Sequence, residues 1–352
     1  MNDEIDAVSR RTMFELTGKS ALAAIAGGSG GALLASPTEN GLPADDLTSA
    51  WFTLSRTIEQ FSVEFGNLGA PPHDLDRAEA HRLFLRYLSI GMDQSIEYTD
   101  PAFPDFYQKT RDGVRKFAGD SPEQLYDTAT VSGDYDYVVS GNIKDVFMIE
   151  LGAYSGSLSS DSKAQRRLVD SITERDMEFD KNGDFTVLLG KEKRGGNSLL
   201  LDRDSSVVSV RRYLRDPIAD KPRPLTIKRV SGRAELAPLT GWRLSEQLIK
   251  AANFASWNVR TWASWVSRMR HDPSMFNRIV GFDDSGDLYT PSGHRYLHGY
   301  WSIPAGQALL ISFVPPAVKY WSFVPMNYWM ESFEWRFGNK VFASSFNTRP
   351  DS

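Results

Sequence analysis

Two histidines near the C-terminal end come closest, by residue type and spacing, to a chemical site. His294 and His298 are four positions apart, and on a helix this spacing would put both rings within reach of one metal ion. Their flanks, Pro291-Ser292-Gly293 and Gly299-Tyr300-Trp301, favour a strand or loop instead. Strand residues four apart lie about 13 Å from each other, so one metal could not bind both rings. The sequence therefore predicts no metal site.

Either histidine could instead act as a general acid or base, because an imidazole titrates near neutral pH. A nearby carboxyl group would orient the ring, and the candidates are Asp283, Asp284, Asp287 and Glu331. This interpretation makes the protein an extracytoplasmic enzyme, a hydrolase or a lyase. The alternative is that both histidines are ordinary hydrogen-bonded residues.

Aromatic residues give the strongest compositional signal. Eight of the nine tryptophans fall between residues 242 and 335, and the tripeptides Tyr300-Trp301-Ser302 and Tyr320-Trp321-Ser322 repeat twenty positions apart. Core packing is one interpretation, because aromatic side chains bury large areas. The other is a pocket for a small molecule, apolar with a few polar groups. The residues predicted to bind the ligand are Tyr300, Trp301, Tyr320, Trp321, Asn327 and Trp329.

Three functions follow from these residues. The first is binding of an apolar, aromatic or sugar-like small molecule in the aromatic-lined pocket. The second is the enzyme that uses His294 or His298. The third is a structural envelope protein, in which the tryptophan cluster would be wholly buried. The sequence favours binding and leaves the other two open.

Composition excludes several classes of protein. The chain has 352 residues, no cysteine, 40 Lys and Arg, and 45 Asp and Glu, for a formal net charge of -5. Disulfide scaffolds, Cys-ligated metal sites and thiol nucleophiles are excluded. The mild acidity offers no surface for a polyanion, so no nucleic-acid partner is predicted. No cofactor is predicted, and the oligomeric state is left open.

The first 36 residues have the order of an export signal. Ser9-Arg10-Arg11-Thr12-Met13-Phe14 precedes a weakly apolar stretch from Ala21 to Ala35, which is typical of twin-arginine signals. This stretch is about 15 residues long, too short for a transmembrane helix of about 20. We therefore expect an extracytoplasmic protein with no transmembrane helix in its mature chain. A flexible tail is the alternative.

Helical periodicity marks two regions. Residues 44–118 are predicted as a helical N-terminal region that begins with a hairpin, because apolar residues recur every three or four positions from Leu47 to Phe65 and again from Leu83. A second helix is predicted at about residues 241–270. Its stripe, expected to pack against a sheet, is Leu248, Ala252, Ala255, Val259, Trp262, Val266 and Met269.

Strand signals fill most of the remainder. Residues 119–352 are predicted as a β-sandwich interrupted by the helix at 241–270, and the whole chain as an α+β protein. The strands predicted first are 135–140, 146–151, 185–189, 207–213 and 225–230. The Lys and Arg residues between Lys191 and Arg233 are interpreted as a solvated sheet face. The last strands are predicted at 296–303, 308–313 and 320–324, with Pro315-Pro316 in a turn.

Four segments occur in an order that resembles the bacterial family named domain of unknown function 1214. They are Lys116-Phe117-Ala118-Gly119-Asp120-Ser121-Pro122-Glu123-Gln124-Leu125-Tyr126, Gly196-Asn197-Ser198-Leu199, Val210-Arg211-Arg212-Tyr213-Leu214-Arg215-Asp216, and Pro315-Pro316 with Tyr320-Trp321-Ser322. The resemblance spans about residues 75–345. It implies a jelly-roll-like antiparallel β-sandwich and frequent export. Ser198 stands where the family commonly has Trp, and the family's usual C-terminal end is expected to be missing after Ser352.

Overall fold

The structure is a computed structural model that describes residues 46–110, 113–156, 166–233, 235–282 and 294–349. The chain divides into two units, Met1–Ser49 and Ala50–Ser352. The predicted export signal at residues 1–36 lies outside the described residues. The fold below is that of the second unit.

In the described part of the chain, three α-helices lie where the periodicity predicts them. They are α2 (Asp46–Glu64), α3 (Asp74–Met92) and α4 (Gly241–His271). The 3-10 helix η2 (Phe65–Asn67) follows α2, and the π-helix η3 (Asp93–Glu97) extends α3. Thr240 caps α4 by accepting a hydrogen bond from the Arg243 backbone N–H, and Arg268, Arg270 and His271 lie in its last turn. The predicted helical hairpin and the long helix at 241–270 are confirmed.

Two antiparallel sheets form the β part. The first has the strand order β1-β2-β8-β4-β5, and the second has the order β7-β6-β3-β9, in which only the β6–β7 pair is parallel. The strands are β1 (Tyr107–Gln108), β2 (Gln124–Thr130), β3 (Tyr137–Asn142), β4 (Met148–Ser155), β5 (Arg167–Thr173), β6 (Asp184–Gly190), β7 (Ser198–Leu200), β8 (Ser205–Tyr213) and β9 (Thr226–Arg229). The five strands predicted between 135 and 230 are confirmed, and β1, β2, β5 and β7 were not predicted.

The two sheets share one hydrophobic core. Leu151 and Val210 from the first sheet cluster with Val139, Val187 and Ile227 from the second, and all are buried. These inner-face residues alternate along each strand with residues of the outer face. The protein is therefore a mixed α+β fold built on antiparallel sheets, as predicted at that level.

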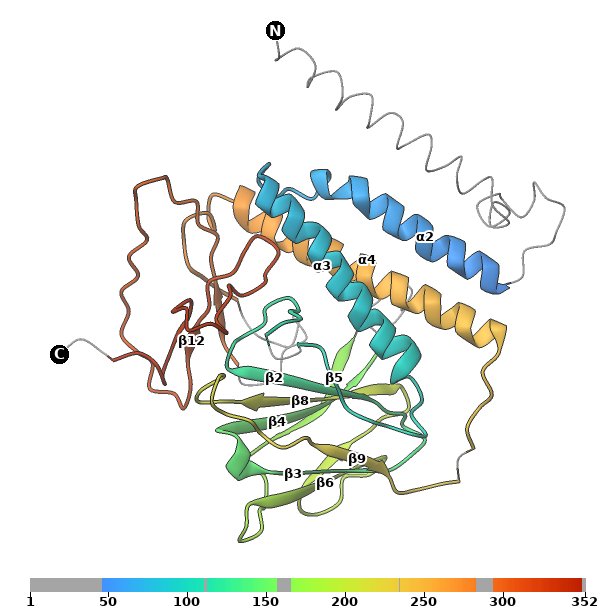
Figure 1. Ribbon diagram of the computed structural model, residues 1–352. Helices are drawn as coiled ribbons and strands as arrows, with labels where there is room; N and C mark the ends of the chain where they lie inside the picture. Colours follow the sequence, from blue (N-terminus) through green and yellow to red (C-terminus); the bar gives the residue numbers. More distant parts are fainter. Residues whose placement is uncertain (1–45, 111–112, 157–165, 234, 283–293, 350–352) are drawn as a thin grey trace, which may run out of the picture. The chain divides into compact units, whose positions relative to one another are not determined.

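The helices have a core of their own. Residues Ala255, Val259, Val266 and Met269 of the α4 stripe cluster with residues of α2 and α3, not with the sheet core. The prediction that this stripe packs against a sheet is therefore wrong. Figure 1 shows α3 and α4 crossing on the side of the five-stranded sheet that faces away from β3 and β6.

The last predicted strands are largely absent. β11 (Tyr296–His298) pairs only with β10 (Val280–Phe282), and β12 (Ser322–Phe323) pairs with β13 (Ala343–Ser344). Residues 308–313 form no strand, and Leu310 and Val314 are about nine-tenths exposed, at 89% and 90%. A strand needs a neighbour to accept its backbone hydrogen bonds, and no described strand lies beside this segment.

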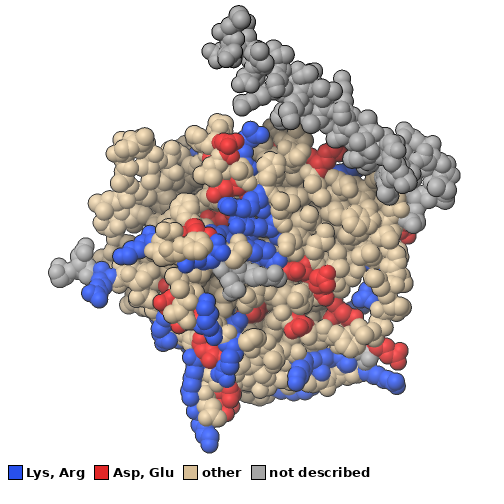
Figure 2. Space-filling view, in the orientation of Figure 1, with Lys and Arg blue, Asp and Glu red and all other residues tan. Residues whose placement is uncertain are grey.

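Charged side chains of both signs are interspersed on the face shown in Figure 2. None of the helices in the described part of the chain has the length and apolar character needed to cross a membrane. Several charged side chains are buried, among them Lys109, Asp120, Glu150 and Arg212.

Candidate functional site

Strands β1, β2 and β8 place polar side chains on both faces of the first sheet. Successive strand residues point to opposite faces, so the neighbours Tyr126 and Asp127 of β2 separate, as do Arg211 and Arg212 of β8. Asp127 and Arg212 point toward the second sheet, and Tyr126 and Arg211 point away from it, toward the helices. Two polar sites result, one on each face.

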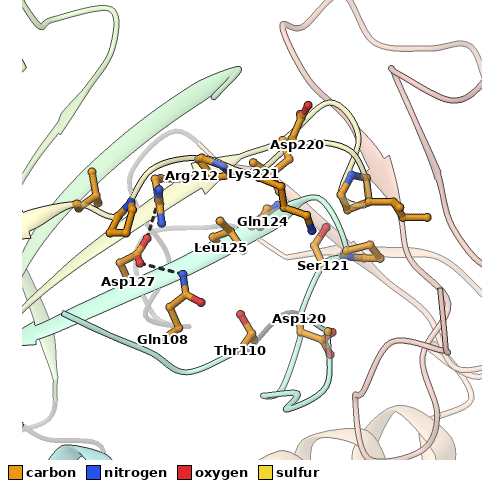
Figure 3. Close-up of a pocket in the computed structure, with 18 of the residues that line it drawn as sticks. Gln108, Thr110, Asp120, Ser121, Gln124, Leu125, Asp127, Arg212, Asp220 and Lys221 are labelled. Atoms are coloured by element: carbon orange, nitrogen blue, oxygen red, sulfur yellow. Dashed lines mark hydrogen bonds and ion pairs between the residues drawn. The ribbon is translucent and has the colours of Figure 1, made fainter. Parts of the chain in front are cut away.

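The first site is a pocket of about 590 Å³ at the end of the sheets (Figure 3). Arg212 donates from Nε to Asp127 Oδ2 at 2.7 Å, and Gln108 donates from Nε2 to Asp127 Oδ1 at 3.1 Å. The loop after β8 adds Asp220 and Lys221. The two members of the Arg212–Asp127 pair are buried and neutralise each other.

Asp120 lies in the same pocket and is held by protein groups. It accepts hydrogen bonds from the Ser332 backbone N–H at 2.9 Å and the Ser332 hydroxyl at 2.6 Å. Burial raises the pKa of the Asp120 carboxyl to about 6. Asp220 accepts in turn from the backbone N–H groups of Arg215 and Asp216. The pocket is polar, but its buried carboxylates already have partners.

The second site is a row of four side chains on the outer face of the first sheet. Tyr126 and Glu150 are the partners of Arg211 on either side of β8. Lys109, just after β1, donates its backbone N–H to the Tyr126 carbonyl at 3.3 Å and so continues the row. We call Lys109, Tyr126, Arg211 and Glu150 the polar row.

His294, a loop residue, lies beside the Glu150 end of this row. His294 Nε2 lies 2.6 Å from the Tyr213 hydroxyl and 3.7 Å from Glu150 Oε2. Tyr296, two residues on, accepts a hydrogen bond from Arg211 Nη1 at 3.2 Å. An imidazole, a phenol and a carboxyl group therefore adjoin one guanidinium, a combination able to bind an anion and to transfer protons.

The two predicted catalytic histidines have different surroundings. His294 belongs to the group around Arg211, as described above. His298 packs against the Trp265 ring, with centroids 4.6 Å apart, and burial lowers its pKa to about 4. A neutral His298 at pH 7 is poorly suited to be a general acid.

Glu331, one of the predicted acidic partners, does not join the histidines. Glu331 forms an ion pair with Arg86 on α3 and is buried. Asp283, Asp284 and Asp287 lie outside the described residues. The carboxyl group beside His294 is Glu150 instead. Among the residues that the structure describes, no group of three or more His, Asp or Glu side chains could hold a metal ion.

Two of the predicted ligand-binding residues lie in the helical part of the fold. Trp329 is buried in the helical core and donates from Nε1 to the Asp76 carbonyl at 2.8 Å. Asn327 donates to Glu79 at 2.9 Å. The structure thus gives Trp329 the core role that the sequence left open.

The four remaining aromatic residues are not gathered around one point. The Tyr320 hydroxyl donates to Glu123 at 2.8 Å, and its ring lies 5.2 Å from Tyr213, so Tyr320 adjoins the His294 group. Three others contact different rings: Tyr300 with Phe276, Trp301 with Phe323, and Trp321 with Phe313.

The polar row itself was not predicted. Lys109, Tyr126 and Glu150 had no assigned role, and Arg211 was interpreted as part of a solvated face, whereas it contacts Tyr126 and Tyr296. The available signal was the pair Arg211-Arg212 within a β-rich run. On a strand, two consecutive arginines must point to both faces, so one of them had to face the core.

Comparison with known proteins supports the fold alone. No family model and no curated protein matches the chain. A crystal structure of an uncharacterised protein from Burkholderia cenocepacia is similar, with a TM-score of 0.77 and 24% identity over 87% of this chain and 85% of that chain. The VPA0106 protein from Vibrio parahaemolyticus matches with a TM-score of 0.25 and 18% identity, over 51% of this chain and 52% of that chain.

Proposed function

We propose that this protein binds a small organic acid on the outer face of its first sheet, with the carboxylate of the ligand facing Arg211. The observation that carries the proposal is the environment of this guanidinium. Its neighbours include the Tyr296 hydroxyl, the Tyr126 ring, whose centroid is 5.4 Å from Arg211 Cζ, and Glu150, whose charge attracts the guanidinium. Among the described residues, no carboxylate lies within ion-pair distance of Arg211.

A cation removed from water without a counterion costs free energy. Glu150 is the register partner of Arg211 and attracts its positive charge, and its carboxylate also contacts His294. Arg212, the next residue, has the paired carboxylate that Arg211 lacks. A ligand carboxylate would supply the counterion, because the planar guanidinium matches a carboxylate with two parallel hydrogen bonds.

The surroundings of Arg211 suit an apolar or aromatic body on this acid. Tyr126 and Tyr154 come from the strands on either side of β8, and Tyr213 lies two residues after Arg211 on β8 itself. Their rings offer flat apolar surface. Small-molecule sites combine such surface with a few charged or polar groups. The sequence also favours binding of an apolar or aromatic small molecule. The residues proposed here differ from those predicted from the sequence.

An acid–base enzyme is the second candidate, and the contacts of His294 favour it. Glu150 could orient the imidazole, which could take a proton from Tyr213 at 2.6 Å. A bound organic acid would then be the substrate. Tyr213→Phe would abolish turnover in this case and leave binding largely intact.

Further proposals concern the fold and the location of the protein. We propose a jelly-roll-like sandwich, supported by the shared core of two antiparallel sheets. We also propose membership of the family domain of unknown function 1214 and twin-arginine export to an extracytoplasmic location. These two rest on the order of the motifs and on Arg10-Arg11.

The binding proposal is tested by thermal unfolding with benzoate, phenylacetate and hexanoate. We expect at least one acid to raise the melting temperature of the wild type and to lose this effect in Arg211→Gln. The ligand-free variant should lose little stability, because the attraction between Arg211 and Glu150 acts beyond ion-pair distance. The control Arg215→Gln changes an exposed arginine near the same strand. A large loss of stability in Arg211→Gln, or no response to any acid, would contradict the proposal.

A further inference from the structure

We infer that Lys109 is a nucleophilic amine that forms a reversible imine with a carbonyl-bearing organic acid on the polar row. The substrate class, an oxo acid, rests on the proposed binding of a carboxylate at Arg211. The nucleophilic role of Lys109 rests on observations of its own.

The first observation is the position of Lys109 in the sheet. Its backbone hydrogen bond to Tyr126 continues the pairing of β1 with β2, in which Tyr107 faces Thr128 and Gln108 faces Asp127. Lys109 therefore points to the same face as Tyr126 and Arg211. A ligand held on this face would lie along the row that contains the amine.

The second observation is the surroundings of the amine. Lys109 is only 6% exposed, and its Nζ lies 5.4 Å from the centre of the Phe117 ring. No hydrogen bond or ion pair from this Nζ to any described residue is present. Burial, and then the positive charge of Arg166, lower the pKa of Lys109 well below its usual value. A neutral amine has the lone pair that attack on a carbonyl carbon requires.

The third observation is that the backbone at Lys109 is fixed. Arg115 donates from Nε to the Lys109 carbonyl at 3.1 Å and also donates to the Gln108 carbonyl. Its guanidinium pairs with Asp93 Oδ2 of η3 at 2.7 Å. π-helical turns are frequent at functional sites. Through Asp93 and Arg115, η3 is connected to Lys109, the first residue of the polar row. A nucleophile held in this way is pre-organised for its reaction.

A second buried lysine provides the contrast. Lys116 is also 6% exposed, but its Nζ donates to the Ser332 carbonyl and, at 3.1 Å, to the Phe333 carbonyl. Burial lowers the pKa of Lys116 as well. Its hydrogens are engaged by two carbonyl groups, so Lys116 has a structural role. The two lysines therefore form a matched pair of the same type and burial.

The reaction is balanced without a further reagent. The lone pair of Lys109 Nζ forms a bond to the carbonyl carbon, and a proton moves from this nitrogen to the former carbonyl oxygen. Loss of that oxygen as water, with the second amine proton, leaves the C=N double bond. Water reverses both steps. Cyanoborohydride, added as a trap, delivers hydride to the carbon and converts the imine into a stable secondary amine.

The test uses the full chain with sodium cyanoborohydride and two probes, benzoylformate, which has a free carboxylate, and methyl benzoylformate, which has the same oxo group and no charge. Peptide mapping by mass spectrometry locates the adduct. We expect benzoylformate to modify Lys109 before any other lysine, and Lys109→Met to lose this adduct while Lys116→Met keeps it. Mapping of the wild type gives the answer even if a variant fails to fold.

The outcomes separate the two proposals. Modification of Lys109 by both probes at equal rates would support the nucleophile and contradict the carboxylate site at Arg211. A preference for benzoylformate that disappears in Arg211→Gln would support both. Adducts spread over exposed lysines, with none at Lys109, would overturn the inference and leave the thermal test of Arg211 standing.

Discussion

Arg211 and Arg212 show how one position along a strand changes the role of a residue. Arg212 has a buried carboxylate partner, Asp127, at 2.7 Å, and the two side chains are 3% and 5% exposed. Arg211 has tyrosine neighbours. The charges of Arg212 and Asp127 neutralise each other, so this pair has a structural role. The second arginine has no carboxylate within ion-pair distance among the described residues, and we propose that a ligand supplies one.

Removal of Asp127 should therefore be costly. In Asp127→Ala the Arg212 guanidinium remains buried without its partner, and the expected loss is about 3–5 kcal/mol in the free energy of unfolding. Urea denaturation measures this loss. The control Asp134→Ala removes a carboxylate of an exposed ion pair with Lys191, and should change stability by less than about 1 kcal/mol. Similar losses in both variants would contradict the distinction.

At this scale the sequence analysis named one residue of the proposed site, His294. Its partners Glu150 and Tyr213 come from strands far away in the chain, and local spacing carries no information on such contacts. The β pattern does show that Arg211 and Arg212 point to opposite faces. It does not show that helices cover the outer face, and so the sequence interpretation left Arg211 in solvent.

Among the elements, α4 was predicted most accurately. Its apolar spacing is unbroken, and most residues of the stripe are buried. An apolar stripe does not reveal whether its partner is a helix or a sheet, and the partner proved to be α3. The strand predicted at 308–313 is absent for a related reason. Strand formation depends on a neighbouring strand, which β-propensity alone cannot supply.

The crossing of α3 and α4 depends on Gly91. A Cβ atom at this position would lie 2.7 Å from the Ala251 backbone carbonyl oxygen, so the helices would have to separate. Gly91→Ala should therefore destabilise the protein by about 1–3 kcal/mol, although alanine favours helix over glycine by about 1 kcal/mol. Gly66→Ala is the control, because nothing lies within 4 Å of its added Cβ. Equal stability of the two variants, measured by thermal unfolding, would refute this packing.

At the scale of the molecule, the buried Asp120 and the half-buried His298 connect folding to pH in opposite ways. The pKa of Asp120 is raised to about 6 from the ordinary value of 3.8, and that of His298 is lowered to about 4 from 6.5, both by burial. Below pH 4 the protonated Asp120 adds stability, which is lost as the pH rises through 6. The neutral His298 adds stability above pH 6.5, which is lost as the pH falls through 4.

Between about pH 4 and 6, the contributions of Asp120 and His298 to stability change in opposite directions as the pH rises. Substitution of Asp120 should therefore reveal the pH dependence that comes from His298. Relative to the wild type, Asp120→Asn should gain about 2–3 kcal/mol in stability as the pH rises from 4 to 6.5. Denaturation of both proteins over this range measures the difference. A difference that does not depend on pH would show that Asp120 titrates at its ordinary value.

A small organic acid could bind at either of two places, the polar row or the pocket of Figure 3. The most direct measurement is a crystal structure of the protein with 4-bromobenzoate, in which anomalous scattering from bromine locates the ligand. We predict its carboxylate on the Arg211 guanidinium, beside Tyr296, and its ring against the tyrosines of the first sheet. A ligand beside Arg212 in the pocket, or no bound ligand at saturating concentration, would contradict the proposed function.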